Sequence, residues 1–336
     1  MTDAVLIEHL SYAYDERPAL DDVGLKVSSG EIYGLLGPNG GGKTTLFRIL
    51  STHLRPQSGT VRVLGHDVVE EAHEVRKRCG VVFQRPGLDP KLRVAENLRH
   101  HGWLYGLWGR VLENRIDALL ATFRLEDRRR DLVETLSGGL QRRVELAKAM
   151  IHSPDLLVFD EPSTGLDPGV RLAFWQDLER LRAESGVTVV LTTHFLEEAE
   201  RCDRIGLMSQ GRLVAEGAPA DLRKRLGEDV VLIRAGDPES LRASIEAATR
   251  IRATVVDGII RISDSGGAGR IAGLYDRFSD QIESLTIGRP TLEDVFISET
   301  GRGFEFEAPE GDEKTVGENK VRESEVRESK AEENDG

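Results

Sequence analysis

The stretch GPNGGGKTT occupies residues 37–45 and places four glycines, one lysine and two threonines in nine positions. It satisfies the pattern GxxxxGK[ST], follows the apolar run IYGLL and precedes the helical run TTLFRIL. Glycines let successive backbone N–H groups converge on an anion, and the start of a helix adds a partial positive charge. A flexible spacer would also be rich in glycine, but it has no reason to end in Lys-Thr-Thr at a helix start. We therefore predict a phosphate-binding loop between a strand and a helix.

The composition of the whole chain is typical of a soluble protein. Its 336 residues suffice for roughly two domains, and hydrophobic and charged residues make up 39% and 31% of them. No run approaches the roughly 20 apolar residues of a membrane span, and the start, MTDAVLIEHL, lacks the pattern of a secretory signal. Cys79 and Cys202 stand far apart, which argues against a disulfide framework or a zinc site. We expect a cytoplasmic protein.

The negative charge of the chain is concentrated at its end. The net charge is −13, and residues 305–336 alone carry 12 acidic and 5 basic side chains. The rest of the chain is only mildly acidic, so it offers no broad electrostatic attraction to nucleic acid or to anionic lipid. We expect no nucleic-acid partner and no direct membrane insertion, and any membrane role must depend on a protein partner.

Residues 1–222 alternate between short apolar strands and helical segments. The strand-like runs EIYGLLG, CGVVFQ, DLLVFDEP and VTVVLTTH are typical of strands buried on both faces. Strands that alternate with helices predict an α/β domain with a mainly parallel sheet. A mostly helical region at about 86–155 interrupts this pattern, and we interpret it as a helical subdomain inserted into the α/β core.

A small α+β domain is predicted at 227–302, followed by an acidic tail. Its segments follow the order β-α-β-β-α-β, with an Asp-Gly turn at 257–258, which suits a ferredoxin-like domain. Residues 303–336 are rich in glutamate, contain VRES twice and are too polar to bury a core. We predict that this tail is disordered; a short charged helix is the alternative.

Two residue pairs in the α/β region suit phosphate chemistry. In the glycine-rich loop, Lys43 would neutralise the β- and γ-phosphates, and the Thr44 hydroxyl would ligate Mg²⁺. In DLLVFDEP, Asp160 ends an apolar strand and could help to hold Mg²⁺, while Glu161 is placed to orient or deprotonate a water molecule. Hydrolysis needs one carboxylate that binds the metal and a second one that orients or deprotonates water, and this pair can supply both. Two acids that merely cap a strand end are the structural alternative.

The motif LSGGLQRRVELAKAM adds a second candidate phosphate contact. Ser137, Gly138 and Gly139 stand directly before a helical run. Serine is a good N-cap residue, and paired glycines let backbone N–H groups approach an anion. Read alone, this motif indicates only a capped helix.

Together these motifs resemble the ATP-binding subunit of an ATP-binding cassette (ABC) transporter over roughly residues 4–222. GPNGGGKTT corresponds to the Walker A motif, LSGGL to the signature and LLVFDE to Walker B, in the family's order. The resemblance implies a P-loop NTPase cassette with a RecA-like core and a helical subdomain. It also implies ATP and Mg²⁺ as cofactors.

The resemblance assigns roles to individual residues. Glu161 would be the catalytic carboxylate, Gln84 would sense Mg²⁺ and water, and His194 would contact the γ-phosphate. Tyr14 would stack on adenine, and Asp167 would lie in the D-loop. The implied nucleotide contacts are Tyr14, Gly37, Pro38, Asn39, Gly40, Gly41, Gly42, Lys43, Thr44, Thr45, Ser137, Gly138, Gly139 and Asp167. The implied metal contacts are Thr44, Gln84 and Asp160.

The same resemblance implies an assembly. Two cassettes would form a homodimer in which the signature of one closes over the ATP held by Walker A of the other. PTLEDVFISETGR at 290–302 is similar to the ending of ATPase subunits of ABC-2-type exporters, including daunorubicin-resistance and sodium-efflux cassettes. The expected protein is therefore the ATP-hydrolysing subunit of an exporter, attached to the cytoplasmic face of the membrane through a separate permease. Its cargo is not readable, because selectivity resides mostly in the membrane subunit.

Two alternatives remain for the function: a soluble ABC ATPase outside transport and a nucleotide-binding regulatory scaffold. The chain has one P-loop and no sustained heptad insertion, which disfavours the ATPases with two cassettes or a long coiled coil. A scaffold would not need the three implied catalytic side chains.

Some residues depart from the family pattern or stay ambiguous. Leu140 stands where many members have glutamine, and Gly41 stands where alanine, serine or cysteine is more frequent. The run HGWLYGLWGR brings Trp103, Tyr105 and Trp108 close to the implied permease contact, but aromatic residues at such spacing also form cores. The adjacent histidines His100 and His101 point about 100° apart on a helix, so we expect no metal site there.

Overall fold

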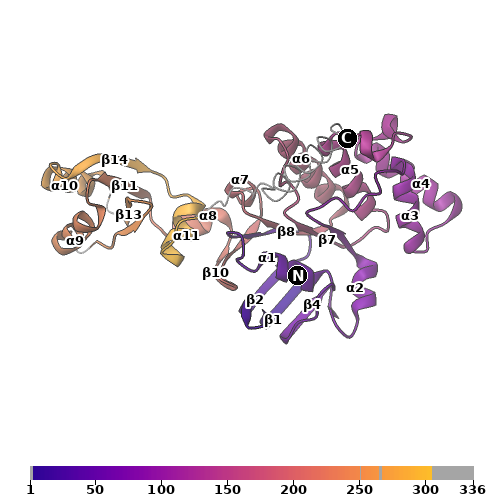
Figure 1. Cartoon of the computed structure of the whole chain (residues 1–336), viewed down its shortest axis with the longest axis horizontal. Coiled ribbons are helices and arrows are strands. Elements are labelled where there is room, and N and C mark those ends of the chain that lie inside the picture. The colour runs from indigo at the N-terminus through magenta and orange to yellow at the C-terminus, as the bar shows by residue number, and fades with distance from the viewer. Residues whose placement is uncertain (1–2, 250, 265–266, 305–336) are drawn as a thin grey trace, which may run out of the picture. The chain divides into compact units, whose positions relative to one another are not determined.

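The computed structural model describes residues 3–249, 251–264 and 267–304. The larger part of the chain contains β1 (Asp3–Tyr14), β2 (Arg17–Ser28), β3 (Ile32–Leu36), α1 (Lys43–Leu50), β4 (Ser58–Val63), β5 (His66–Asp67), α2 (Ala72–Arg78), β6 (Cys79–Val82), α3 (Val94–Leu104), α4 (Gly109–Thr122), α5 (Gly138–Ala149), β7 (Leu156–Asp160), α6 (Pro168–Ser185), β8 (Thr188–Thr193), α7 (Leu196–Ala199), β9 (Arg204–Ser209), β10 (Arg212–Gly217) and α8 (Pro219–Lys224). Short 3-10 turns lie at Glu126–Arg128 and Val133–Thr135. Strands and helices alternate as the sequence predicts (Figure 1).

A six-stranded sheet forms the centre of this part, with the strand order β10-β9-β3-β8-β7-β6. β9, β3, β8, β7 and β6 run parallel to one another, and β10 pairs antiparallel with β9. Every residue of β3, β7 and β8 is buried. Such continuous burial is typical of parallel strands covered on both faces. The predicted α/β fold is confirmed.

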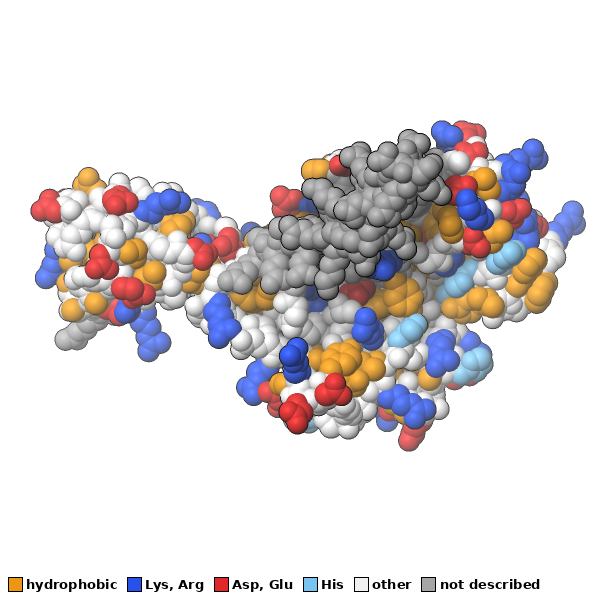
Figure 2. All heavy atoms as spheres, in the orientation of Figure 1, with side chains coloured by type: hydrophobic (Ala, Val, Ile, Leu, Met, Phe, Trp, Pro, Cys, Tyr) orange, Lys and Arg blue, Asp and Glu red, His pale blue; other side chains and the backbone are white. Residues whose placement is uncertain are grey.

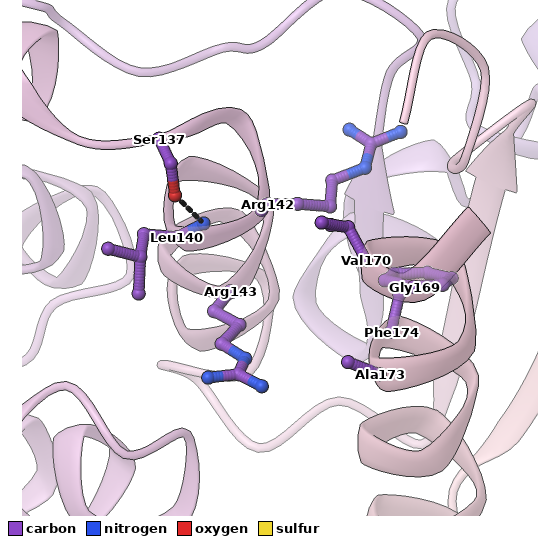
Figure 3. A pocket seen from close by; sticks show the side chains of 9 residues that line it. Ser137, Leu140, Arg142, Arg143, Gly169, Val170, Ala173 and Phe174 are labelled. Atoms are coloured by element: carbon purple, nitrogen blue, oxygen red, sulfur yellow. Dashed lines mark hydrogen bonds between the residues drawn. The ribbon is translucent and has the colours of Figure 1, made fainter. Parts of the chain in front are cut away.

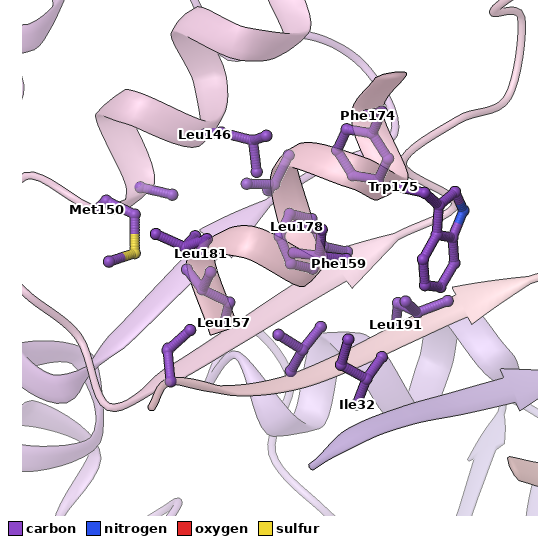
Figure 4. Close-up of a cluster of buried hydrophobic side chains, with 14 of the residues drawn as sticks. Ile32, Leu146, Met150, Leu157, Phe159, Phe174, Trp175, Leu178, Leu181 and Leu191 are labelled. Atoms are coloured by element: carbon purple, nitrogen blue, oxygen red, sulfur yellow. The ribbon is translucent and has the colours of Figure 1, made fainter. Parts of the chain in front are cut away.

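Side chains of the central strands alternate between two cores. Leu157 and Phe159 of β7 join one buried cluster, whereas Leu156 and Val158 join the other. Figure 4 shows the first cluster, in which strand residues lie under Phe174, Trp175 and Leu178 of α6. The alternation follows from the two-residue period of a strand. Complete burial of each large apolar side chain stabilises the fold by about 1.5–3 kcal/mol.

The second core lies under an antiparallel sheet with the strand order β2-β1-β4-β5. One side of helix α1 fills this core through Leu46, Phe47, Ile49 and Leu50. The N-terminus of α1 is thereby fixed at the end of β3, directly after the glycine-rich loop. The predicted helical subdomain contains α3, α4 and α5, whose apolar side chains pack in the first cluster.

The chain after α8 forms β11 (Asp229–Ala235), α9 (Pro238–Thr249), β12 (Thr254–Val256), β13 (Ile259–Asp264), α10 (Gly267–Phe278), β14 (Ile282–Gly288) and α11 (Leu292–Thr300). The four strands form an antiparallel sheet with the order β12-β13-β11-β14 and have a buried cluster of their own. Helix α11 instead contributes Leu292, Val295 and Phe296 to the first cluster of the larger part. The limits of 227–302 for the small domain therefore stay a prediction. The packing of α11 favours an end of this domain at Gly288.

Two predictions concern the remaining chain and the membrane. Residues 305–336 of the predicted acidic tail lie outside the described residues, whereas Phe304 packs against Phe296. Among the helices that the structure describes, none combines the length and the apolar character required to cross a bilayer.

Candidate active site

The glycine-rich loop connects β3 to α1, and two of its glycines have backbone angles that other residues rarely adopt. Gly40 has φ 74° and Gly42 has φ 100°. A Cβ atom at position 42 would also lie 2.5 Å from the Ala19 carbonyl oxygen. At Gly37 no positive φ is involved, but a Cβ atom there would overlap the Met208 carbonyl oxygen of β9. Close approach of the backbone and left-handed angles therefore explain these glycines without reference to a ligand.

Lys43 is the first residue of α1 and lies inside this loop. Its side chain is only 4% exposed, and Nζ donates hydrogen bonds to the carbonyl oxygens of Gly37 at 2.8 Å and Pro38 at 3.0 Å. Nζ also lies 3.4 Å from Oε1 of Glu161. Burial lowers the pKa of the Lys43 ammonium, while the nearby carboxylates oppose this change. The loop thus encloses a buried cation that is held by its own carbonyl groups.

Thr44 and Asp160 bring two oxygen donors together from the start of α1 and the end of β7. Thr44 Oγ1 donates to Asp160 Oδ1 at 3.3 Å, and Thr192 Oγ1 donates to the same oxygen at 2.7 Å. Burial raises the pKa of the Asp160 carboxyl. Hydroxyl and carboxylate oxygens are the ligands that Mg²⁺ prefers, so these residues fit a magnesium site beside the phosphate loop.

Glu161 follows Asp160 and faces both Lys43 and His194. Its Oε2 lies 3.2 Å from His194 Nδ1 and accepts a hydrogen bond of 3.2 Å from Thr164 Oγ1. Burial alone would raise the pKa of this carboxyl, but the contact with His194 and the charge of Lys43 lower it to about 2. Glu161 is therefore ionised throughout the neutral pH range.

The backbone at Glu161 is unusual. Its φ of 44° lies in the left-handed region, which is uncommon for a residue with a side chain. The Glu161 N–H donates to Thr192 Oγ1 at 2.9 Å, which holds the residue in this conformation. Residues in the left-handed region also occur elsewhere in this chain, but such conformations cluster at active sites when surrounding contacts hold them. The strained turn directs the carboxylate toward Lys43.

A buried carboxylate, Glu198, supports the same site and is absent from the sequence predictions. It is 1% exposed and accepts hydrogen bonds from Ser163 Oγ and, at 2.6 Å, from Thr193 Oγ1. Thr193 precedes His194, and Ser163 lies in the same loop as Glu161. Glu198 therefore links the loop that carries Glu161 to the segment that carries His194. The sequence HFLEEAE contains three glutamates, and nothing in its pattern distinguishes the buried Glu198 from the other two.

The signature residues form a separate pocket between α5 and α6. Ser137 is the N-cap of α5, and its Oγ accepts a hydrogen bond of 3.4 Å from the Leu140 N–H (Figure 3). The pocket has a volume of about 230 Å³ and is also lined by Gly139, Val170 and Phe174. A Cβ atom at position 139 would lie 2.6 Å from Val170 Cγ1, so a larger residue there would have to displace the Val170 side chain. The expected anion contact of Ser137 and the glycines stays a prediction.

The structure brings together only part of the predicted site. Lys43, Thr44, Asp160, Glu161 and His194 lie within one network of contacts. Within the described chain this network does not include the exposed residues Gln84, Tyr14, Asp167 and Ser137. Tyr14 does contact α1, because Arg48 Nη1 donates to its hydroxyl at 3.4 Å. The loop residues Pro38 and Asn39 lie between Gly37 and Gly40, and Thr45 is buried in α1.

Alanine at position 37 is expected to damage the site more than alanine at position 41. The Gly37→Ala methyl group would overlap the Met208 carbonyl, and such overpacking costs about 1–3 kcal/mol of stability. At position 41 the methyl group would lie 3.0 Å from the Pro38 carbonyl, a tight contact that a small shift can relieve. Thermal unfolding and ATPase rates of the two variants test this difference. Equal losses in both variants would contradict it.

Known proteins are similar to this chain in sequence over most of its length. The family described as ABC transporter matches residues 20–164. The daunorubicin resistance ATP-binding protein DrrA3 of Streptomyces coeruleorubidus is 38% identical over 316 residues, which cover 89% of this chain and 96% of that protein. The Nod factor export ATP-binding protein I of Cupriavidus pinatubonensis is 41% identical over 292 residues, or 86% of this chain and 88% of that protein.

Solved structures with the same fold are also ATP-binding cassettes. CbiO1 of Clostridium perfringens, part of the ABC transporter complex CbiONQ, superposes with a TM-score of 0.63 at 25% identity. That alignment covers 74% of this chain and 97% of CbiO1. A dimeric post-hydrolysis state of the cassette MJ0796, bound to ADP and Pi, gives a TM-score of 0.58 at 28% identity and covers 64% of this chain and 98% of MJ0796.

Proposed function

Because the chain belongs to the ABC transporter family, we propose that it is the ATP-hydrolysing subunit of an ABC-2-type exporter that works with a separate membrane permease. The observation that carries this proposal is the grouping of Lys43, Asp160 and Glu161 at the loop between β3 and α1. Two relatives named for drug resistance and for Nod factor export support the assignment to exporters. The cargo of this chain stays open.

The buried cation and the strained carboxylate suit hydrolysis of a phosphoanhydride. Lys43 would bind phosphate oxygens with the N–H groups of the glycine-rich loop and of the start of α1. Thr44 and Asp160 would hold Mg²⁺, which neutralises charge on the phosphates when bound. Glu161 would accept a hydrogen bond from the attacking water and orient it, and His194 would hold the carboxylate in place.

Arrival of the substrate should also strengthen Glu161 as a base. Without phosphate, Lys43 and His194 both contact this carboxylate and keep its pKa at about 2, which makes it a weak proton acceptor. Phosphate oxygens would compete for the Lys43 ammonium and draw it away from Glu161. The loss of that positive charge would raise the pKa of Glu161. The loss of the Lys43 contact would therefore make Glu161 more basic when ATP occupies the loop, whereas the charge of Mg²⁺ would act in the opposite direction.

The exposed predicted residues suit a site that a second copy completes. Ser137, Asp167 and Tyr14 face solvent, and the pocket between α5 and α6 is open beside Ser137. In the proposed homodimer, Ser137 of one copy would close over ATP held by Lys43 of the other. Dissociation after hydrolysis would transmit the change to the permease.

An exposed aromatic surface on α3 and the start of α4 is the proposed permease contact. Trp103, Leu104, Trp108 and Val111 are 38%, 81%, 60% and 68% exposed, and the two indole rings stack at 5.5 Å. Figure 2 shows hydrophobic and histidine side chains together over this region. Aromatic side chains that stay exposed in this way are typical of interaction surfaces. The sequence also allowed these aromatic residues to belong to the core, but Trp108 is too exposed to be a core residue.

We expect Trp108→Asp to weaken attachment to the membrane without lowering the intrinsic ATPase rate. The chain should cofractionate with membranes only when its permease is coexpressed, and the charged side chain should disrupt an apolar contact. The matched control is Tyr275→Asp on α10, where the tyrosine is 53% exposed. Cofractionation is measured by sedimentation and the rate by phosphate release with MgATP. Tight binding of the isolated chain to pure lipid vesicles, or no phosphate release, would contradict the proposed function.

A further inference from the structure

We infer that Arg142 and Glu145 form a positioning pair, which holds the loop after β6 and the loop after β7 against helix α5. The inference deepens the proposed function, because these two loops carry Gln84 and Glu161. It concerns residues to which the sequence motifs assign no role.

The guanidinium of Arg142 contacts both loops from inside the protein. Arg142 is 5% exposed and donates from Nε to the Pro162 carbonyl and from Nη1 to the Phe83 carbonyl at 3.0 Å. Pro162 directly follows Glu161, and Phe83 directly precedes Gln84. One side chain of α5 therefore fixes the backbone next to Gln84 and Glu161, two of the three proposed catalytic residues.

Glu145 completes this arrangement one helical turn later. It is 3% exposed, pairs with Arg142 Nη1, and accepts a hydrogen bond of 2.7 Å from the Gly87 N–H. Lys148, a further turn along α5, donates to the Gly87 carbonyl. The loop after β6 is thus bound to α5 at two points, at Phe83 and at Gly87. Phe83, Gly87 and Glu145 also line a cavity of about 350 Å³.

The geometry of the pair favours positioning over stabilisation. A buried ion pair contributes little net stability compared with apolar residues of similar volume, because both charges lose their hydration. A planar guanidinium can instead bind several carbonyl groups in fixed directions. Arg142 uses this capacity on two separate loops, and Glu145 balances its charge. The pair therefore serves to fix the orientation of these two loops relative to helix α5.

The next residue of the same helix provides a matched control. Arg143 pairs with Asp177 of α6 at 2.9 Å, and Asp177 is 3% exposed. This second pair, in which Asp177 is buried and Arg143 is partly exposed, joins two helices. Within the described residues, the hydrogen bonds of Asp177 come from Arg143 and Arg180 and not from the loops at Phe83 and Pro162. Disruption of this pair should therefore perturb stability without changing the positions of Gln84 and Glu161.

Three variants test the inference: Glu145→Gln, the double variant Arg142→Met with Glu145→Leu, and the control Asp177→Asn. We expect the first two to lower kcat about tenfold with little change in the KM for ATP, because water positioning is disturbed while the phosphate loop is intact. The double variant is an apolar replacement that should still fold. We also expect faster amide hydrogen exchange at 83–87 and 162–165 in the nucleotide-free chain. Asp177→Asn should change neither quantity.

The outcomes separate this inference from the proposed function. Unchanged kcat and unchanged exchange in the double variant would overturn the inference, as would an equal loss in Asp177→Asn. A wild-type chain that releases no phosphate would contradict the proposed function instead. The exchange rates of the nucleotide-free chain would then decide the inference alone.

Discussion

The Glu161→Gln variant is expected to bind MgATP but to hydrolyse it at least about 10²-fold more slowly than the wild-type chain. The amide has nearly the shape of the carboxylate and keeps an acceptor oxygen, but it cannot take a proton from water. Lys43 and Thr44, which would contact the phosphates and Mg²⁺, are unchanged. The affinity for ATP should therefore be retained. Phosphate release and binding of a fluorescent ATP analogue measure the two effects separately.

A neighbouring carboxylate serves as the control for this variant. Glu197 is exposed on α7, close in sequence to His194, and it has no place in the described network around Lys43. Glu197→Gln should leave kcat unchanged. Equal turnover in Glu161→Gln and the wild type would rule out Glu161 as the residue that activates water.

The Lys43→Ala variant is expected to lose both nucleotide binding and hydrolysis, with kcat/KM at least about 10²-fold lower. Lys43 supplies the buried positive charge in the phosphate loop and is 4% exposed, so water cannot readily replace its Nζ. Without this charge the loop also loses the hydrogen bonds from Nζ to the Gly37 and Pro38 carbonyls. Equilibrium binding of ATP and phosphate release check the two losses.

Lys77→Ala on α2 is the matched control, because its lysine is 51% exposed and pairs only with Glu74 of the same helix among its described contacts. Removal of an exposed lysine should leave ATP binding intact. If Lys43→Ala bound ATP as tightly as Lys77→Ala, the glycine-rich loop could not be the main phosphate contact.

The central sheet and the phosphate loop could be predicted from the sequence because their signals are local. The strands β3 and β7 are largely apolar runs and β8 consists of valine, leucine and threonine, and the lysine and threonine of the loop stand at the start of a helix. The parallel topology then brings the ends of β3 and β7 to the same edge of the sheet. That arrangement explains why Thr44 and Asp160 meet although 116 positions separate them.

Other features depend on tertiary contacts that carry no local signal. Glu198 accepts a hydrogen bond from Ser163 Oγ, and Thr192 accepts one from the Glu161 N–H, so both support the site through contacts between segments that are far apart in the sequence. Arg142 and Glu145 lie in a helix whose charged residues are equally consistent with a solvated face. Helix α11 packs with the larger core, whereas sequence order alone placed it in the small domain. The contacts of Gln84, Ser137 and Asp167 with nucleotide stay predictions, because in this proposal a second copy completes the site.

The mass of Glu161→Gln in solution tests the central claim most directly. A single chain has a mass of 37.2 kDa. In the proposed cycle, ATP closes two copies over two nucleotides and hydrolysis separates them, so a variant that cannot hydrolyse should accumulate in the closed state. Light scattering of this variant should show twice the single-chain mass with MgATP and a lower mass without nucleotide. A variant that binds MgATP yet keeps the mass of one chain would contradict the account.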